Sequence, residues 1–129
     1  MKKNSVLFVC LGNICRSPAA EAIFISLLEK KRLTDGFIVD SAGTGSWHIG
    51  KKADSRMRIA AERRNINILS RARQITNKDF DKFNYIIAMD DSNFRNIQDL
   101  KNRTASAGFA SIKKIQDFRT VFNLSLIHI

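Results

Sequence analysis

The sequence contains little of what defines several large classes of protein. Its 129 residues include only two cysteines, Cys10 and Cys15, which are too few for a disulfide framework. Structural zinc sites take four ligands, and their cysteine pairs are usually separated by two residues. Here four residues separate the cysteines, and the two histidines, His48 and His128, are scattered. We therefore expect no structural zinc site.

Long hydrophobic runs are also missing. None approaches the roughly 18 residues that a membrane-spanning helix needs, so we expect no contact with a membrane. The basic start at Lys2 and Lys3 is followed by an apolar run from Val6, as in a signal peptide. However, this run breaks at Gly12 and is followed by Arg16, which a signal core would exclude. A cytoplasmic location is the resulting expectation.

Acidic residues are in the minority, with 12 against 22 basic residues and a net charge of +10. Residues 1–64 hold twelve basic and six acidic residues, and residues 65–129 hold ten and six, so the excess does not form a basic arm. The sequence has no zinc finger, aromatic RNA-binding signature or helix-turn-helix pattern. We expect no nucleic acid partner, although a positive surface would attract phosphorylated substrates.

Strand and helix patterns alternate along the chain. The β-branched and aromatic run at 6–10 predicts a buried strand, and a loop follows it. Ser17 and Pro18 then predict a helix start, with a capping hydroxyl followed by proline at the first helical position. Apolar residues recur at helical spacing from Ala20 to Leu28. This unit is strand, loop and helix.

The alternation of strands and helices continues as far as residue 112. Strands are predicted at 37–41 and 85–89, with a weaker one at 110–112. Helices are predicted at 54–64, 78–83 and 90–100, the first with Met57, Ala60 and Ala61 on its inward face. Such alternation predicts an α/β fold with a parallel sheet, whose ligands bind beyond the carboxyl ends of the strands.

The loop from Cys10 to Ser17 lies at such a carboxyl end. Its backbone N–H groups and the following helix N-terminus can surround an anion, and Gly12 and Asn13 tolerate the left-handed turns of such a cradle. Arg16 can bind two phosphate oxygens through its planar guanidinium. The complete set of proposed phosphate-binding residues is Leu11, Gly12, Asn13, Ile14, Cys15, Arg16 and Ser17.

Cys10 would lie at the bottom of this cradle. Amide groups that bind phosphate also stabilise a thiolate, and the Ser17 hydroxyl would add a hydrogen bond. Cys10 could then attack phosphorus while Arg16 and the amides stabilise the equatorial oxygens. Taken alone, a cysteine that ends a buried strand is more often a small core residue, and Cys-x5-Arg is a weak pattern. Cys15 is either loop filler or the partner of Cys10 in a reversible disulfide.

The whole context is far more specific than the cysteine alone. Residues 6–18 read Val-Leu-Phe-Val-Cys-Leu-Gly-Asn-Ile-Cys-Arg-Ser-Pro, which resembles the signature of the low-molecular-weight protein tyrosine phosphatases. The resemblance continues through 20–22, 40–44, 72–75 and 89–93, and it reaches about Phe118. It implies a four-stranded parallel sheet flanked by helices, no cofactor, and a phosphotyrosine protein or a small phosphate ester as substrate.

The resemblance also implies roles for individual residues. Cys10 would be the nucleophile that carries a phosphocysteine, and Arg16 the arginine that stabilises the transition state. Asn13 would hold the unusual backbone of the loop, with a hydrogen bond from Ser41 at the neighbouring strand end. Trp47 would stack on the substrate ring at the rim, although a partly buried loop aromatic is an equally good interpretation.

Two departures from the family pattern stand out. Many members have a histidine that supports the loop just before Ala-Arg-Gln, whereas Ser70 and Arg71 occupy that stretch, so we expect weaker support. Members also carry an Asp-Pro pair whose aspartate is the general acid. This chain has a single proline, Pro18, and therefore no such pair; Asp117 is the nearest late aspartate.

The last residues do not resemble the family. Residues 124–129 read Leu-Ser-Leu-Ile-His-Ile, which is similar to a translated sequencing adapter. We therefore expect a phosphatase domain over 1–118 that lacks its acid loop and last helix, followed by a non-family tail over 119–129.

Three functions follow from these observations. The first is hydrolysis of phosphotyrosine or aryl phosphates through Cys10. The second is a phosphate-binding remnant with little turnover. The third is an arsenate reductase that uses an external thiol, because two cysteines cannot support the three-cysteine relay of those enzymes.

Overall fold

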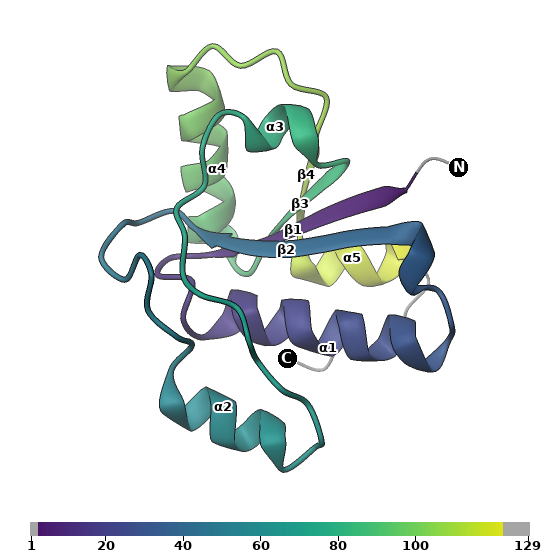
Figure 1. The fold of residues 1–129 in the computed structure, drawn as a ribbon. Coiled ribbons are helices and arrows are strands. Elements are labelled where there is room, and N and C mark those ends of the chain that lie inside the picture. The colour runs from purple at the N-terminus through teal and green to yellow at the C-terminus, as the bar shows by residue number, and fades with distance from the viewer. Residues whose placement is uncertain (1–2, 123–129) are drawn as a thin grey trace.

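The computed structural model describes residues 3–122. Its centre is a parallel four-stranded sheet in the order β2-β1-β3-β4 (Figure 1). The strands are β1 (Asn4–Cys10), β2 (Phe37–Gly43), β3 (Tyr85–Ala88) and β4 (Ser111–Lys114). The predicted fold class is confirmed. Central β1 is buried from Ser5 to Cys10, because parallel sheets of this kind are covered on both faces.

Helices form the two outer layers. α1 (Arg16–Lys30) and α5 (Ile115–Phe122) cover one face, and α3 (Asp79–Lys82) and α4 (Asp91–Arg103) cover the other (Figure 1). α2 (Ser55–Glu62) lies beyond α1, and a short 3₁₀ helix, η1 (Thr34–Gly36), precedes β2. The loop between β1 and α1 therefore lies at the carboxyl edge of the sheet.

Alternate residues of β1 enter two separate cores. Phe8 packs in edge-to-face contacts with Phe24 of α1 and Phe118 of α5, with ring centroids 5.9 and 5.4 Å apart. Leu7 and Val9 face the opposite core, beneath α3 and α4. Since the side-chain period of a strand is two, this alternation fixes which face each β1 residue presents.

A smaller cluster fixes α2 against α1. Ala19, Ala53 and Ile68 are buried together, and Met57 and Ala61 pack against them. The prediction that Ala60 also faces inward is wrong, because Ala60 is exposed. α2 has only two turns, and only part of its surface packs against α1. Ala60 lies outside that part.

The predicted helix start after the loop needs a correction. α1 begins at Arg16, two residues earlier than expected, and Cys15 occupies the N-cap without a side-chain hydrogen bond. Ser17 is not the cap because its hydroxyl faces Cys10 instead. Pro18 still lies in the first turn, where its missing N–H costs no helical hydrogen bond.

Two other helix starts agree with the sequence. Asp54 caps α2 by accepting from the Arg56 and Met57 N–H groups, and Asp90 caps α4 by accepting from Asn93 N–H. Residues 115–122, for which no helix was predicted, form α5. No helix within residues 3–122 is long and apolar enough to cross a membrane. The predicted tail at 119–129 falls largely outside the described residues.

Candidate active site

The loop between β1 and α1 packs directly on the end of β2. A side chain at Gly43 would approach the Leu11 carbonyl oxygen to 2.7 Å and the Asn13 nitrogen to 3.1 Å, so only glycine allows this contact. The Gly43 N–H donates to the Arg73 carbonyl, and its own carbonyl accepts from Ile75 N–H, both at 2.8 Å. The loop is thus fixed between β1, β2 and the segment at 73–75.

Neighbouring backbone groups hold the carbonyls of the loop. Thr44 N–H donates to the Cys10 carbonyl and Gly45 N–H to the Leu11 carbonyl, both at 2.9 Å, and Asp54 N–H donates to the Ile14 carbonyl at 2.7 Å. Within residues 3–122, the loop N–H groups at 11, 12, 14 and 15 have no protein acceptor. With carbonyls tied and N–H groups unpaired, the loop is suited to binding an anion.

Asn13 is the central support of the loop. Its backbone has φ of 57°, the left-handed conformation that the sequence predicted at this point. Its amide nitrogen donates to the hydroxyls of Ser17 and Ser41 at 2.8 and 3.0 Å, and its amide oxygen accepts from Arg73 N–H at 2.9 Å. The predicted contact with Ser41 is present, and three segments converge on one buried side chain.

The Cys10 thiol lies inside this network. It is 3% exposed, 3.0 Å from the Ser17 hydroxyl and 3.3 Å from Asn13 N–H, which donates to it. Asn13 already donates to the Ser17 oxygen, which leaves the Ser17 hydroxyl hydrogen free to point toward Cys10 or the Ala42 carbonyl. The sulfur of Cys10 thus has two polar neighbours, the Asn13 N–H group and the Ser17 hydroxyl.

A partly buried carboxyl group that the sequence did not single out ends this chain of hydrogen bonds. The Ser41 hydroxyl donates to Glu21 at 2.6 Å. Burial raises the pKa of Glu21, and the nearby Asp40 charge adds to the effect, while hydrogen bonds from Ser41 and Ser70 oppose it. Ser70, in the stretch where many relatives of the predicted family have histidine, thus contacts the same carboxyl group.

A second unpredicted support lies below the loop. The Arg73 side chain donates to Asp40 at 3.1 Å and to both oxygens of Asp79 at 3.1 Å. Burial lowers the pKa of Arg73, but the two carboxylates outweigh it and raise that pKa above its ordinary value. This ion-pair cluster fixes the backbone N–H that Arg73 offers to Asn13. The sequence around Arg73, Asp40 and Asp79 did not indicate that these residues would form ion pairs.

Arg16 projects from the start of α1 toward α4. Its guanidinium donates to Asp90 at 2.8 Å, and each of the two side chains is about two-fifths exposed. Burial raises the pKa of Asp90, but hydrogen bonds from Asn93 N–H and Arg16 outweigh it and hold that pKa below its ordinary value. Asp90 therefore holds Arg16 at the mouth of the loop while remaining ionised.

A cavity of about 220 Å³ opens above the thiol. Its lining is formed by Cys10, Leu11, Gly12, Ile14, Cys15, Arg16, Trp47 and His48. Trp47 lies on the rim and is 67% exposed, in agreement with the predicted rim position.

His48 was not expected near Cys10, but the two line the same cavity. Its ring lies so close to Gly12 that a side chain there would approach the ring to 2.9 Å. The His48 Nδ1 atom is buried without a hydrogen-bond partner in the described part of the chain. In the sequence, only the fact that His48 follows Trp47 could have indicated that it lines the cavity above Cys10.

Cys15 also lines the cavity, but its surroundings differ from those of Cys10. Partial burial raises the pKa of the Cys15 thiol, and the Asp54 charge raises it further. Both cysteines are free thiols. The two interpretations of Cys15, loop filler or disulfide partner, stay open. Among the described residues, no three His, Cys, Asp or Glu side chains are grouped closely enough to hold a metal ion.

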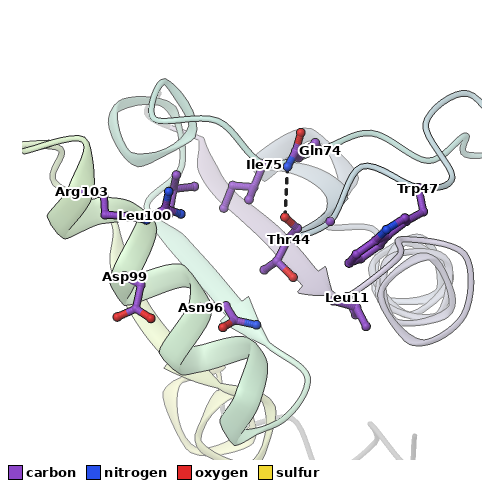
Figure 2. Close-up of a pocket in the computed structure, with 10 residues that line it drawn as sticks. Leu11, Thr44, Trp47, Gln74, Ile75, Asn96, Asp99, Leu100 and Arg103 are labelled. Carbon is purple, nitrogen blue, oxygen red and sulfur yellow. Dashed lines mark hydrogen bonds between the residues drawn. The ribbon is translucent and has the colours of Figure 1, made fainter.

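A second cavity of about 270 Å³ lies on the other side of Leu11 and Trp47. Figure 2 shows it between the Thr44 and Gln74 segments and one side of α4, which contributes Asn96. Gln74 donates to the Thr44 carbonyl at 3.1 Å and closes its upper edge. Leu11 and Trp47 therefore line both cavities, whereas the other loop residues that line the cavity above the thiol do not line the second one.

A family model described as "Low molecular weight phosphotyrosine protein phosphatase" matches residues 5–128. The phosphatase of that name from Schizosaccharomyces pombe is 48% identical over 109 residues, which are 83% of this chain and 70% of that protein. The Sus scrofa protein of the same name is 46% identical over 93 residues, 72% of this chain and 59% of that protein.

Solved structures give the same result. YfkJ from Bacillus subtilis superposes with a TM-score of 0.83 at 42% identity and covers 92% of this chain and 73% of that one. A Drosophila arginine phosphatase superposes with a TM-score of 0.83 at 35% identity and covers 93% and 74%. The comparisons confirm the predicted family and its hydrolase class. The chain spans 59–70% of the length of the two curated relatives above.

Proposed function

This chain belongs to the low molecular weight phosphotyrosine protein phosphatase family, and from that premise we propose that it hydrolyses protein phosphotyrosine or small aryl phosphates through a phosphocysteine on Cys10. The observation that supports this most directly is the pair of contacts to its thiol, from Ser17 and from Asn13 N–H. A simple core cysteine would not need two polar partners beneath a loop of unpaired N–H groups.

The first chemical step is attack of the Cys10 thiolate on phosphorus. A sulfur–phosphorus bond forms while the bond from phosphorus to the phenolic oxygen breaks, and the phenolic oxygen leaves with the electron pair. The equatorial oxygens carry the charge of the transition state, and the loop N–H groups and Arg16 stabilise it. Arg16 contacts one oxygen of Asp90 at 2.8 Å, whereas a phosphate at the cavity that Arg16 lines would offer its guanidinium two acceptor oxygens.

The second step regenerates the thiolate. Water attacks the phosphocysteine, the sulfur leaves with its electrons, and inorganic phosphate departs. Ser17 and Asn13 stabilise the leaving thiolate through the same contacts that hold it before the reaction. Ser41 supports the step indirectly, because it fixes the Asn13 side chain.

The lining of the cavity favours an aromatic substrate. Leu11 and Trp47 are 49% and 67% exposed at the rim, where they can contact a phenyl ring. One of the similar structures is an arginine phosphatase, so phosphoarginine is the competing substrate. No carboxylate lines the cavity in the described residues, and Asp90 at its mouth is already paired with Arg16, so a substrate guanidinium group would have no unpaired carboxylate to contact. Phosphotyrosine is therefore the better match.

The experiment is a comparison of three reactions at equal concentrations. Initial rates are measured for phosphotyrosine and phosphoarginine, and thiol-dependent reduction is measured for arsenate. We expect phosphotyrosine to be hydrolysed fastest. A faster rate on phosphoarginine, or arsenate reduction without ester hydrolysis, would replace the proposed substrate. Phosphate binding without any turnover would leave the phosphate-binding remnant as the function.

The proposal extends to the location and the limits of the domain. A catalytic thiolate needs a reducing compartment, and both cysteines are free, which supports a cytoplasmic location. We retain the domain boundary at residue 118 as a prediction, with residues 119–129 as the tail.

A further inference from the structure

The positive charge of this chain is concentrated around α2 in space, although it is spread evenly between the two halves of the sequence. Residues 51–71 contain seven basic residues and only two acidic residues, Asp54 and Glu62. They form the loop before α2, α2 itself and the segment that returns from it, which lie together beyond α1 (Figure 1). Half of the net charge of +10 therefore comes from this one region.

Two of these basic residues face each other directly. Lys52 and Arg71 are partners in an isolated antiparallel bridge, and both are exposed. Together with Arg58 they line a cleft of about 170 Å³, in which Glu62 is the single carboxylate among the lining residues. We call this hollow the basic cleft. Like charges directly across a bridge repel each other, so this arrangement is unfavourable without an anion.

The cations of the basic cleft are oriented but not neutralised. The Arg71 guanidinium donates to the Gly50 carbonyl at 3.0 Å, and Arg58 donates to the Ala53 carbonyl at 2.9 Å. No carboxylate lies within ion-pair distance of Lys52, Arg58 or Arg71 in the described residues. Backbone carbonyls fix the direction of the two guanidinium groups and leave N–H donors for a ligand.

The two arginines closest to the Cys10 loop show the opposite arrangement. Arg73 is paired with Asp40 and Asp79, and Arg16 is paired with Asp90. Exposure to solvent alone does not explain why the cations of the basic cleft lack carboxylate partners, because Arg16 has such a partner and is itself about two-fifths exposed. The chain thus neutralises its cations at the phosphate loop and leaves those of the basic cleft available.

The basic cleft lies close to the cavity above Cys10. Lys51 N–H donates to the His48 carbonyl at 2.9 Å, and His48 lines that cavity. Lys52 follows His48 by four residues, which can span at most about 14 Å even when fully extended. An extended peptide covers the same distance in about four residues. A substrate bound at Cys10 can therefore reach the cleft.

We propose that the basic cleft binds a glutamate or aspartate side chain of the substrate, about three to five residues from the phosphotyrosine. This inference rests on the proposed function and adds a substrate class to it: phosphotyrosine proteins with acidic flanking sequence. A cleft of about 170 Å³ admits one side chain, whereas a nucleic acid or a membrane needs an extended basic surface. The observations therefore favour a peptide carboxylate.

The test uses phosphotyrosine peptides that differ only at positions three to five on either side of the phosphotyrosine. One series carries glutamate there, a second glutamine and a third lysine. We expect kcat/KM about three- to tenfold higher for the glutamate peptides, which is the size of effect expected for two exposed ion pairs, with the difference shrinking as salt is added. Rates on p-nitrophenyl phosphate, which has no flanking residues, provide the reference.

Matched variants distinguish the effect of the basic cleft from the effect of the overall positive charge of the protein. Lys52→Gln with Arg71→Gln should reduce the preference for glutamate to less than twofold. Lys30→Gln with Lys31→Gln removes the same charge at the far end of α1, where both residues are exposed, and should leave the preference intact. Equal rates for glutamate and glutamine peptides, or equal losses in the two double variants, would overturn the proposal.

Binding measurements keep the test independent of turnover. In a Cys10→Ser variant, the dissociation constants of the same peptides should show the same order and the same dependence on Lys52 and Arg71. Preference for glutamate in binding, combined with no hydrolysis of p-nitrophenyl phosphate by the parent chain, would contradict the proposed function and leave the cleft assignment standing. Tighter binding of a single-stranded oligonucleotide or anionic vesicles than of the glutamate peptide would contradict the assignment.

Discussion

The floor and the rim of the cavity above Cys10 are built in opposite ways. On the floor, Cys10, Asn13 and Ser17 are almost fully buried and joined by hydrogen bonds of 2.8–3.3 Å. On the rim, Leu11 and Trp47 are 49% and 67% exposed. The floor is fixed by buried hydrogen bonds, whereas the exposed side chains of the rim can adjust to different ligands.

This difference separates chemistry from substrate choice. Groups that stabilise a transition state must be fixed in advance, because reorganisation during the reaction costs energy. Groups that contact the rest of a substrate contribute mainly to binding, and their loss affects substrates unequally. Substitutions on the floor should therefore reduce turnover of every substrate, and substitutions on the rim should change the ranking of substrates.

The largest effect is expected for the nucleophile. Cys10→Ser should reduce turnover by more than about a thousandfold, because a serine hydroxyl in this cradle is a far weaker nucleophile than a thiolate. Binding of inorganic phosphate should remain measurable by calorimetry, since Arg16 and the loop N–H groups are unchanged. Turnover near the parental rate would rule out Cys10 and with it the division between floor and rim.

The next effect concerns the proton that the leaving group needs. Among the described carboxyl groups, Asp90 contacts Arg16 but has a lowered pKa, and Asp117 is exposed on α5. Neither is suited to donate a proton, and general acid catalysis is worth about a hundred- to ten-thousandfold. We expect steep dependence of the rate on leaving-group pKa across substituted aryl phosphates, with p-nitrophenyl phosphate hydrolysed and phosphotyrosine peptides much slower.

A flat series at high rates would contradict this expectation. Asp90→Asn and Asp117→Asn would then identify the donor, because only the donor variant should restore the steep dependence. Resequencing the genomic locus beyond Asn123 would show whether an Asp-Pro pair follows in the natural reading frame.

Arg16→Lys tests whether stabilisation of the transition state needs the geometry of the guanidinium as well as its charge. A lysine ammonium cannot reproduce the two-pronged contact of a guanidinium, so we expect a loss of about a hundred- to a thousandfold in kcat. Arg95→Lys is the matched control, because Arg95 is exposed on α4. Equal rates for Arg16→Lys and the parent would show that positive charge alone is sufficient at this position.

A smaller and more selective effect is expected on the rim. Trp47→Ala should raise KM for aryl phosphates by about two- to tenfold with little change in kcat, since an aromatic contact contributes about 0.5–1.5 kcal/mol. Trp47→Phe should recover most of the loss. A fall in kcat that is equal for aryl and alkyl phosphates would show that Trp47 affects turnover of every substrate, as the floor residues do.

The smallest effect concerns stability. Burial raises the pKa of Glu21, so the folded state favours its protonated form. The resulting stabilisation is present below the ordinary value of about 4.3 and is lost as pH rises through the raised value. Glu21→Gln should therefore be more stable than the parent at pH 7, with the difference closing toward pH 4. Denaturant unfolding at several pH values measures this, and a constant difference would contradict it.

Local patterns predicted most of the fold and the residues of the loop. The alternation of strands and helices, the glycine and asparagine at 12–13 and the capping residues Asp54 and Asp90 each carry their own signal. The wrong inward assignment of Ala60 shows the limit of such signals, because a two-turn helix with a weak apolar face can turn several ways. Helix propensity alone does not fix that rotation.

The supports of the loop could not be predicted in the same way. Glu21, Arg73 and His48 reach the site from distant positions, and their sequence neighbours say nothing of the partners they meet. Ion pairs and buried hydrogen bonds depend on tertiary distance, which the parallel sheet creates by bringing β1, β2 and the segment at 73–75 to one edge. Resemblance to a family supplied Ser41 and Trp47, which the pattern alone did not.

One measurement tests the central claim most directly. The chain is mixed rapidly with p-nitrophenyl phosphate, denatured during turnover, and examined by ³¹P NMR and peptide mass spectrometry. The good leaving group should make phosphorylation fast, and hydrolysis without a well-placed base should be slower, so a phosphocysteine should accumulate. We expect one phosphoryl group on the peptide that contains Cys10. A phosphoryl group on another residue, or turnover in which the protein never carries one, would contradict the account.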